Sequence, residues 1–196
     1  MSSFRVDDAG IGEILISRDE LEQRVAALGK QLTEDYAGRR PLLVCILRGA
    51  YVFFTDLARA IDLPVEIDFM AVASYGNSSR TSGTVRLVKD LDEDIAGRDV
   101  LLVEDIVDTG LTLRYLRRSL QARRPASLEV VTLLARESAD LERLGVQYVG
   151  FEIGSDFVIG YGLDVDQRYR NLEMIARYDQ AKDPLAGRND PRDATG

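Results

Sequence analysis

A single stretch of the chain carries the strongest structural signal, because an apolar run ends there in adjacent acids. Residues 100–103 are typical of a buried strand, and Glu104 and Asp105 follow them directly. An Asp-Thr-Gly turn signal comes next, at 108–110, and apolar residues then recur at helical spacing from Leu111. The order predicts a buried strand, a tight loop and a helix, with three carboxylates where the strand meets the loop.

The loop and the start of the helix are suited to an anion, whereas the acids beside them are not. The first amide hydrogens of a helix lack intrahelical partners, so with the hydroxyls of Thr109 and Thr112 they can bind a phosphate group. Glu104 and Asp105 would repel that phosphate unless a magnesium ion or a sugar diol lay between them. We therefore expect a phosphorylated sugar with a metal, and Asp108 remains for proton transfer. The alternative is a plain turn in which Asp and Thr only cap the helix, although a cap needs one acid and not three.

Composition limits the classes of protein to which the chain can belong. Its 196 residues, 45% of them hydrophobic, are enough for one sizeable core. We expect a single domain over 1–179 and a polar, disordered and dispensable tail over 180–196. The net charge of -8 argues against a nucleic-acid binder. Without histidine, the chain cannot build Ser-His-Asp or Cys-His nucleophiles or histidine-ligated zinc.

No apolar run is long enough for a membrane span, and the N-terminus lacks a signal-type apolar segment. We therefore expect a soluble, cytoplasmic protein without a membrane partner. The single cysteine, Cys45, lies in an apolar run and is expected in the core. Lysine occurs only at Lys30, Lys89 and Lys182, so 22 of the 25 basic residues are arginines.

Strand-like and helix-like segments alternate along the chain, which predicts an α/β sheet covered on both faces. Ligands of such sheets bind along the carboxyl ends of the strands. A capping box at 17–20 marks the beginning of the first helix. Helices are expected at 17–38, 52–61 and 111–122, and strands at 41–47, 65–74, 85–88, 100–103, 128–134 and 148–153.

The order of an apolar strand, two adjacent acids, two variable residues and Asp-Thr-Gly resembles the signature of the phosphoribosyltransferase family. The resemblance implies the type I phosphoribosyltransferase fold, with a central, mostly parallel sheet, helices on both faces and a small hood. It also implies 5-phosphoribosyl-1-pyrophosphate (PRPP) as a substrate and Mg²⁺ as the cofactor. Glu104 and Asp105 would then hold the ribose diol and the metal, and Asp108 would accept a proton from the purine. The 5-phosphate would be bound by Ile106, Val107, Asp108, Thr109, Gly110, Leu111 and Thr112.

A second segment, at 47–50, is similar to the pyrophosphate loop of purine phosphoribosyltransferases. The resemblance implies that Arg48 and Gly49 contact PRPP and that the peptide bond between Leu47 and Arg48 is cis. Without the acidic motif, the same residues would be interpreted as an ordinary turn after a strand.

A third segment begins with Ser74 and Tyr75, which are similar to the base of the family's long flexible loop. Residues 75–84 are rich in Gly and Ser, as expected for a loop that closes over the reacting centre and excludes water. The alternative is a solvated hairpin, because such segments are common.

Residues 157–164 and the Tyr-Arg-Asn-Leu sequence at 169–172 resemble the hypoxanthine-guanine branch of the family. The alternative makes the first two of these residues part of a core strand. By the similarity, Phe157 stacks on the purine, the Val158 backbone reads its edge, Asp164 lies at the purine and takes part in metal coordination, and Arg170 approaches the pyrophosphate.

One position departs from the family's pattern. Arg136 stands where family members usually carry a lysine that contacts the purine 6-oxo group. Arginine keeps the charge and can donate to a carbonyl oxygen, but its planar fork is wider than an ammonium group. Drift in a lysine-poor chain and a changed base preference both remain open. The following residues, Glu137, Ala139 and Asp140, also replace basic residues of the family.

The resemblance implies a magnesium-dependent enzyme that joins hypoxanthine, and also guanine, to the phosphoribosyl group of PRPP, and that forms a homodimer or homotetramer. One alternative is a xanthine-guanine or other base-specific phosphoribosyltransferase. A second alternative is a regulator with the same fold that senses nucleotides and binds RNA. The acidic composition argues against that regulator, and so does Asp108, where one such pyrimidine regulator family carries tyrosine.

Overall fold

The computed structural model describes residues 10–74 and 85–186, which fall into two compact units. The terminal unit combines the two ends of the chain, Met1–Leu21 and Asp156–Gly196. The central unit holds Glu22–Ser155. Among the helices of the described residues, none is long and apolar enough to cross a membrane.

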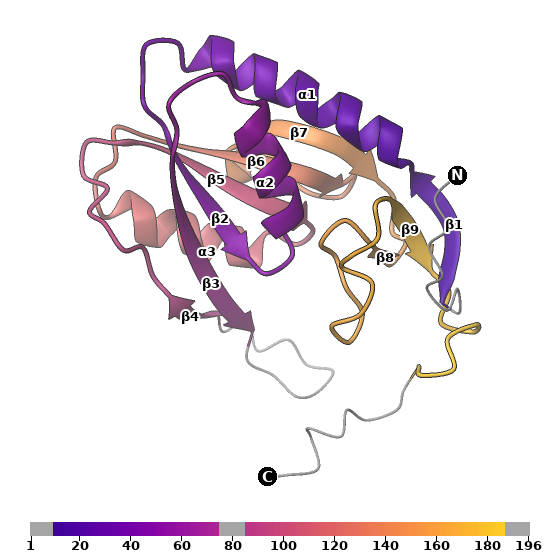
Figure 1. The fold of residues 1–196 in the computed structure, drawn as a ribbon. Helices are drawn as coiled ribbons and strands as arrows, with labels where there is room; N and C mark the ends of the chain where they lie inside the picture. Colours follow the sequence, from indigo (N-terminus) through magenta and orange to yellow (C-terminus); the bar gives the residue numbers. More distant parts are fainter. Residues whose placement is uncertain (1–9, 75–84, 187–196) are drawn as a thin grey trace. The chain divides into compact units, whose positions relative to one another are not determined.

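The central unit contains a six-stranded sheet in the order β4-β3-β2-β5-β6-β7 (Figure 1). Its neighbouring strands run parallel, except that β4 pairs antiparallel with β3 at one edge. The sheet therefore confirms the expected mostly parallel α/β architecture. Its strands are β2 (Leu42–Leu47), β3 (Glu66–Ser74), β4 (Val85–Lys89), β5 (Asp99–Val107), β6 (Ser127–Arg136) and β7 (Val146–Ile153).

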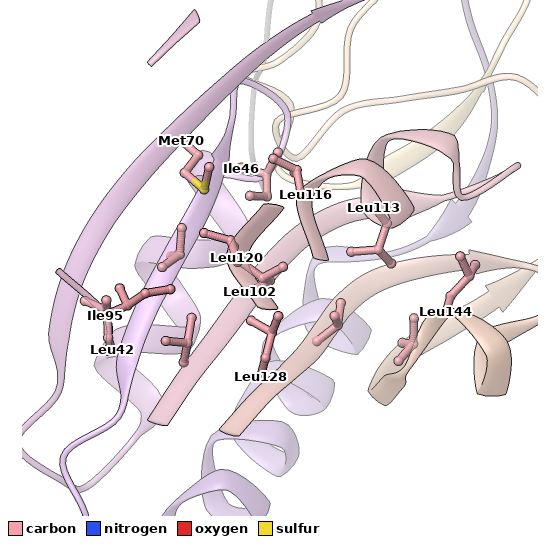
Figure 2. Packing of buried hydrophobic residues seen from close by; sticks show 14 of the residues in the cluster. Leu42, Ile46, Met70, Ile95, Leu102, Leu113, Leu116, Leu120, Leu128 and Leu144 are labelled. Atoms are coloured by element: carbon pink, nitrogen blue, oxygen red, sulfur yellow. The ribbon is translucent and has the colours of Figure 1, made fainter. Parts of the chain in front are cut away.

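Helices cover both faces of this sheet (Figure 1). The leucines of α3 pack on one face, against alternate residues of β2 and β5 such as Ile46 and Leu102 (Figure 2). Because side chains alternate across a strand, Leu43 and Cys45 point to the other face, on which α1 and α2 lie. Cys45 is completely buried, as expected. The helices are α1 (Arg18–Asp35), α2 (Tyr51–Ala60), α3 (Leu111–Gln121) and α4 (Leu141–Leu144).

The capping box predicted for the first helix is present. The Ser17 backbone N–H donates to the Glu20 carboxylate at 2.8 Å, and the Glu20 N–H donates to the Ser17 hydroxyl at 3.4 Å. The helix ends at Asp35, three residues before the glycine at 38 that was expected to end it. Residues 36–38 form a turn instead, in which the Tyr36 ring is buried under the guanidinium of Arg39.

The strand that carries the acids is longer than predicted. The sequence ends it at residue 103, whereas β5 continues to Val107, with Glu104 opposite Thr132 and Ile106 opposite Leu134 of β6. Polar side chains do not end a strand while a neighbouring strand still pairs with its backbone. The two acids therefore lie on rigid sheet rather than in a loop.

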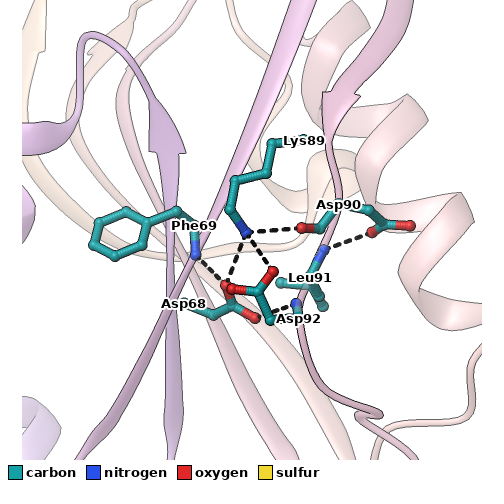
Figure 3. A network of polar contacts seen from close by, with 6 residues as sticks. All are labelled: Asp68, Phe69, Lys89, Asp90, Leu91 and Asp92. Atoms are coloured by element: carbon teal, nitrogen blue, oxygen red, sulfur yellow. Dashed lines mark hydrogen bonds and ion pairs between the residues drawn. The ribbon is translucent and has the colours of Figure 1, made fainter.

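A polar network fixes the turn that follows β4 (Figure 3). The buried carboxylate of Asp68 on β3 accepts hydrogen bonds from the backbone N–H groups of Phe69 and Asp92, at 2.6 and 2.8 Å. The Lys89 ammonium lies 3.4 Å from Asp68, 3.0 Å from the Asp92 carboxylate and 2.9 Å from the carbonyl of Asp90. Three acceptors around one point suit a compact ammonium better than a planar guanidinium, in a chain that otherwise uses arginine.

The terminal unit contains a small antiparallel sheet in the order β1-β9-β8, which accounts for the hood that the resemblance implies. Of its strands, only β8 was considered, as the alternative interpretation of residues 157–158; the others are short and pair only with distant segments. The short helix α4 was also missed. The strands are β1 (Ile11–Ile16), β8 (Val158–Ile159) and β9 (Ile175–Tyr178).

Candidate active site

The parallel neighbours β2 and β5 bring two groups of predicted site residues to the same edge of the central sheet. β5 carries Glu104 and Asp105, and β2 leads into the loop at 47–50. Cys45 of β2 pairs with Val103 of β5, so the residues that follow each strand emerge together. A Cβ placed on Gly49 would lie 1.4 Å from an Oδ atom of Asp105, which means that only glycine fits against this carboxylate. The peptide bond between Leu47 and Arg48 is cis, as the resemblance implies.

Glu104 is the chemically unusual member of this group. Its side chain is buried, and its Oε2 atom has no hydrogen-bond partner among the described residues. Burial raises the pKa of Glu104 well above its usual range, and the neighbouring Asp105 raises it further. A buried carboxylate oxygen without a donor is rare in folded proteins, and it indicates a position where a ligand supplies the missing interaction.

The loop after β5 forms an open hollow of about 340 Å³, lined by Glu104 and residues 106–113. Gly110 precedes α3 in a left-handed conformation with φ of 69°, and a Cβ there would lie 2.5 Å from Leu144. No side chain caps α3 at this residue, and the Thr109 hydroxyl reaches the Leu111 N–H only at 3.5 Å. A helix that begins at a glycine, with one long contact from the preceding threonine, is suited to an anion at its first amides.

The carboxylates at the end of β5 fit a magnesium ion. Mg²⁺ prefers oxygen ligands and is usually bound by one or two carboxylates together with substrate oxygens. Glu104 supplies an unpartnered oxygen, and Asp105 follows it on the same strand. Within 10–74 and 85–186, no group of three or more Asp, Glu, Cys or His residues is arranged to hold a metal by itself. A magnesium ion held by one or two carboxylates takes its other oxygen ligands from water and from a substrate.

Two other predicted residues lie at strand ends of the central unit. Arg136 ends β6, next to the end of β5, and its guanidinium donates to the carbonyl oxygen of Gly154. Ser74 ends β3 and pairs with Val85. Tyr75, the other residue expected at the base of the flexible loop, lies outside the described residues, as does the loop itself.

The remaining predicted site residues gather in the terminal unit. The Phe157 side chain is 54% exposed, whereas Val158 is buried in β8, so the core-strand alternative holds only for Val158. Asp164 and Arg170 form an ion pair at 2.7 Å, and the Arg170 guanidinium also donates to the Gly162 carbonyl at 2.8 Å. The structure therefore brings the sequence-predicted residues together in two groups, one in each unit.

Sequence reasoning missed one buried acid of the terminal unit. Asp183 lies in the segment predicted to be the tail, yet its side chain is 1% exposed and forms an ion pair with Arg168. An aspartate in a polar stretch without hydrophobic periodicity gives no sequence signal of burial. Residues 187–196, the rest of the predicted tail, lie outside the described part of the chain.

Comparisons with known proteins agree with this geometry. The phosphoribosyl transferase domain model matches residues 15–167. The hypoxanthine-guanine phosphoribosyltransferase of Mycobacterium tuberculosis is 50% identical over 175 residues, which cover 86% of this chain and 87% of that protein. The corresponding protein of Streptococcus thermophilus is 43% identical over 165 residues, covering 84% of this chain and 92% of that protein.

Solved structures give the same result. A hypoxanthine phosphoribosyltransferase from Staphylococcus aureus superposes with a TM-score of 0.85 at 39% identity, covering 92% of this chain and 98% of that one. A hypoxanthine-guanine phosphoribosyltransferase from Bacillus anthracis gives a TM-score of 0.80 at 40% identity, covering 86% and 99%. The protein therefore belongs to the phosphoribosyltransferase family and, within it, to the hypoxanthine-guanine enzymes of purine salvage.

Proposed function

We propose that this protein transfers the 5-phosphoribosyl group of PRPP to hypoxanthine and guanine, releasing pyrophosphate. The observation that carries the proposal is the buried carboxylate of Glu104, which has an unpartnered oxygen beside a loop suited to phosphate. A strand end and loop that carry three acids, Glu104, Asp105 and Asp108, can bind a phosphorylated sugar only if a cation and hydroxyl groups separate the charges. The family to which the chain belongs supplies the reaction class.

The roles in the central unit follow from chemistry and placement. Glu104 and Asp105 would hold the ribose hydroxyls and Mg²⁺, and the bound ion would supply positive charge to the pyrophosphate side of the site. The amides and hydroxyls of residues 106–112 bind the 5-phosphate. Arg48 and the backbone of Gly49 bind the pyrophosphate. No step of the reaction requires a histidine, which the chain lacks.

Proton transfer is assigned to Asp108, because it is the acid that the metal and the ribose do not use. Its side chain is exposed in the loop that lines the hollow, where an incoming purine can reach it. As the bond from the ribose to the purine forms, Asp108 accepts the proton of N7. Asp108→Asn should lower turnover by about two to four orders of magnitude while nucleotide binding persists.

Purine recognition is assigned to the terminal unit and to Arg136. The exposed ring of Phe157 stacks on the base, the Val158 backbone reads its edge, and Asp164 and Arg170 act at the metal and the pyrophosphate. Arg136 donates to the 6-oxo group. Because guanidinium donors recognise a carbonyl oxygen, 6-oxo purines are preferred over adenine.

The decisive experiment measures pyrophosphate release with hypoxanthine, guanine, xanthine and adenine, each with and without Mg²⁺. Release with hypoxanthine or guanine only in the presence of Mg²⁺ is expected. Preference for xanthine would favour the xanthine-guanine alternative, and preference for adenine would contradict the base assignment. Tight, nucleotide-dependent retention of RNA in filter binding would favour the regulator instead.

We also propose that the enzyme works in the cytoplasm as a homodimer or homotetramer, as is usual for its family. Light scattering coupled to size-exclusion chromatography distinguishes these assemblies from a monomer. The domain boundary at 179 remains a prediction, and truncation experiments described below bear on it.

A further inference from the structure

Asp183 is a fully engaged acid for which the proposed reaction has no use. Its side chain is 1% exposed. The Arg168 guanidinium donates to its two oxygens at 3.1 and 2.7 Å, the Tyr178 hydroxyl donates at 2.7 Å, and the Leu185 N–H donates at 2.9 Å. These four donors hold the buried carboxylate in one orientation, and we call this group of contacts the Asp183 junction. A bidentate, charge-assisted pair such as Arg168–Asp183 is both strong and directional.

The first branch of this junction leads to the loop that carries Asp164 and Arg170. Arg168 lies inside this loop, where Asp166, Gln167 and Tyr169 have φ values of 49°, 63° and 72°. Such left-handed conformations are unfavourable for residues with a side chain, and they persist only where surrounding contacts enforce them. The ion pair between Arg168 and Asp183 is one of those contacts, because Arg168 lies between the left-handed residues Gln167 and Tyr169.

The second branch leads to the exposed ring of Phe157. Tyr178 of β9 donates its hydroxyl to Asp183, and its ring meets the Phe157 ring in a T-shaped contact with centroids 5.8 Å apart. The Tyr178 backbone N–H also donates to the Phe157 carbonyl at 2.8 Å. Asp183 therefore connects Tyr178, which supports the ring of Phe157, with the loop that carries Asp164 and Arg170.

The charge states match these contacts. The Arg168 hydrogen bonds hold the pKa of Asp183 well below its usual range, and the Tyr178 hydroxyl strengthens the effect. Burial and the bond to Asp183 raise the pKa of Tyr178 to about 12. The Asp183 carboxylate therefore stays ionised and the Tyr178 hydroxyl stays protonated across the physiological pH range. The hydrogen bonds between them do not depend on pH in that range.

We infer that Asp183 is a positioning residue that holds Phe157 and the Asp164–Arg170 loop in the arrangement that binds substrates. The inference rests on the proposed function of those residues. It also reverses the expectation that the segment from residue 180 is dispensable. Asp183 touches no substrate, so its removal should weaken substrate binding more than it slows the chemical step.

The test compares Asp183→Asn with Asp179→Asn. Asp179 is a matched control, because it lies four residues away and pairs at 2.8 Å with the exposed ammonium of Lys182 and with backbone N–H groups of its own turn, not with Arg168 or Tyr178. For Asp183→Asn, KM for PRPP and guanine should rise about tenfold while kcat changes less than about threefold. The control should keep both constants within about twofold of the wild type.

Two further variants keep the inference testable if Asp183→Asn folds poorly. Arg168→Lys retains the charge but loses the two-pronged geometry, and it should raise the same KM values about threefold. A chain ending at Ala186 should behave as the wild type, whereas one ending at Lys182 should show the KM increase of Asp183→Asn. Unchanged KM values, with only a lower melting temperature or active fraction, would overturn the positioning role. Wild-type turnover in the same assay tests the proposed function separately.

Discussion

Two acids of the central sheet have similarly low solvent exposure but differ in the hydrogen bonds and charges around them. Asp68 on β3 and Glu104 on β5 are 6% and 8% exposed, and only β2 separates their strands. Asp68 accepts two backbone hydrogen bonds and contacts the Lys89 ammonium, so both of its oxygens are satisfied. In the part of the chain that the structure describes, one Glu104 oxygen has no hydrogen-bond donor, and its neighbour is an acid.

Their pKa values move in opposite directions as a result. For Asp68, burial acts to raise the pKa, but the two backbone N–H donors and Lys89 outweigh it, and the pKa falls below its usual range. For Glu104, burial is reinforced by Asp105, and the pKa rises. Low solvent exposure alone therefore does not distinguish the two acids; the lack of compensating donors marks Glu104 as the candidate for the site.

The sharpest test of this contrast is Glu104→Gln. The substitution keeps the shape but removes the charge that a metal and a ribose diol require, so turnover should fall by at least about 100-fold. The free energy of unfolding of the unliganded protein should rise by about 1 kcal/mol, because an unfavourable buried charge is gone. Steady-state kinetics and urea denaturation measure the two effects. A less stable variant with normal turnover would contradict the contrast.

Gly49→Ala tests whether the loop at 47–50 packs directly against Asp105. The new methyl group would collide with the Asp105 carboxylate, and we expect a loss of about 2 kcal/mol in the free energy of unfolding. Asp105→Ala should relieve much of this loss in the double variant. Urea denaturation of the four proteins of this double-mutant cycle gives the coupling energy, and a value near zero would show that the two residues do not meet.

Asp68→Asn addresses the other member of the pair. The amide NH₂ must face either the Phe69 or the Asp92 N–H, which leaves two donors opposed and costs about 1–3 kcal/mol of stability. Turnover at saturating substrate should remain near that of the wild type. Asp92→Asn, whose side chain is 76% exposed, is the control and should cost less than about 1 kcal/mol. A large loss of turnover in Asp68→Asn at unchanged stability would assign Asp68 to the reaction.

The smallest expected effect is a pH dependence. Because the folded-state pKa of Asp68 lies below the unfolded value near 3.9, its stabilising contribution is present above that value and is lost as the pH falls. The stability difference between wild type and Asp68→Asn should therefore shrink as the pH falls from 6 to 3. Denaturation midpoints at several pH values give this difference. A difference that grows toward low pH would have the wrong sign.

Sequence patterns predict those elements of the molecule whose residues are neighbours along the chain. β5, its loop and α3 are contiguous, so an apolar run, an acidic pair and a glycine turn were enough to find them. The capping box of α1 was found for the same reason. The end of β5 was predicted wrongly, because pairing with β6 decides where that strand ends.

The rest depends on contacts between distant segments. β1 and β9 come from opposite ends of the chain and pair only after folding, which no short pattern encodes. The same holds for Gly49 against Asp105 and for Arg168 against Asp183. Sequence reasoning thus named the residues that we propose for the site, but it could not supply the contacts that hold them.

The close approach of Gly49 to Asp105 also limits how this protein can evolve. Every amino acid that a single base change can introduce at a glycine codon carries a Cβ atom, and any Cβ at this position meets the carboxylate. Any such residue would therefore force the Asp105 carboxylate out of its place at the strand end. Changes in this loop and changes at the end of β5 should accordingly be inherited together.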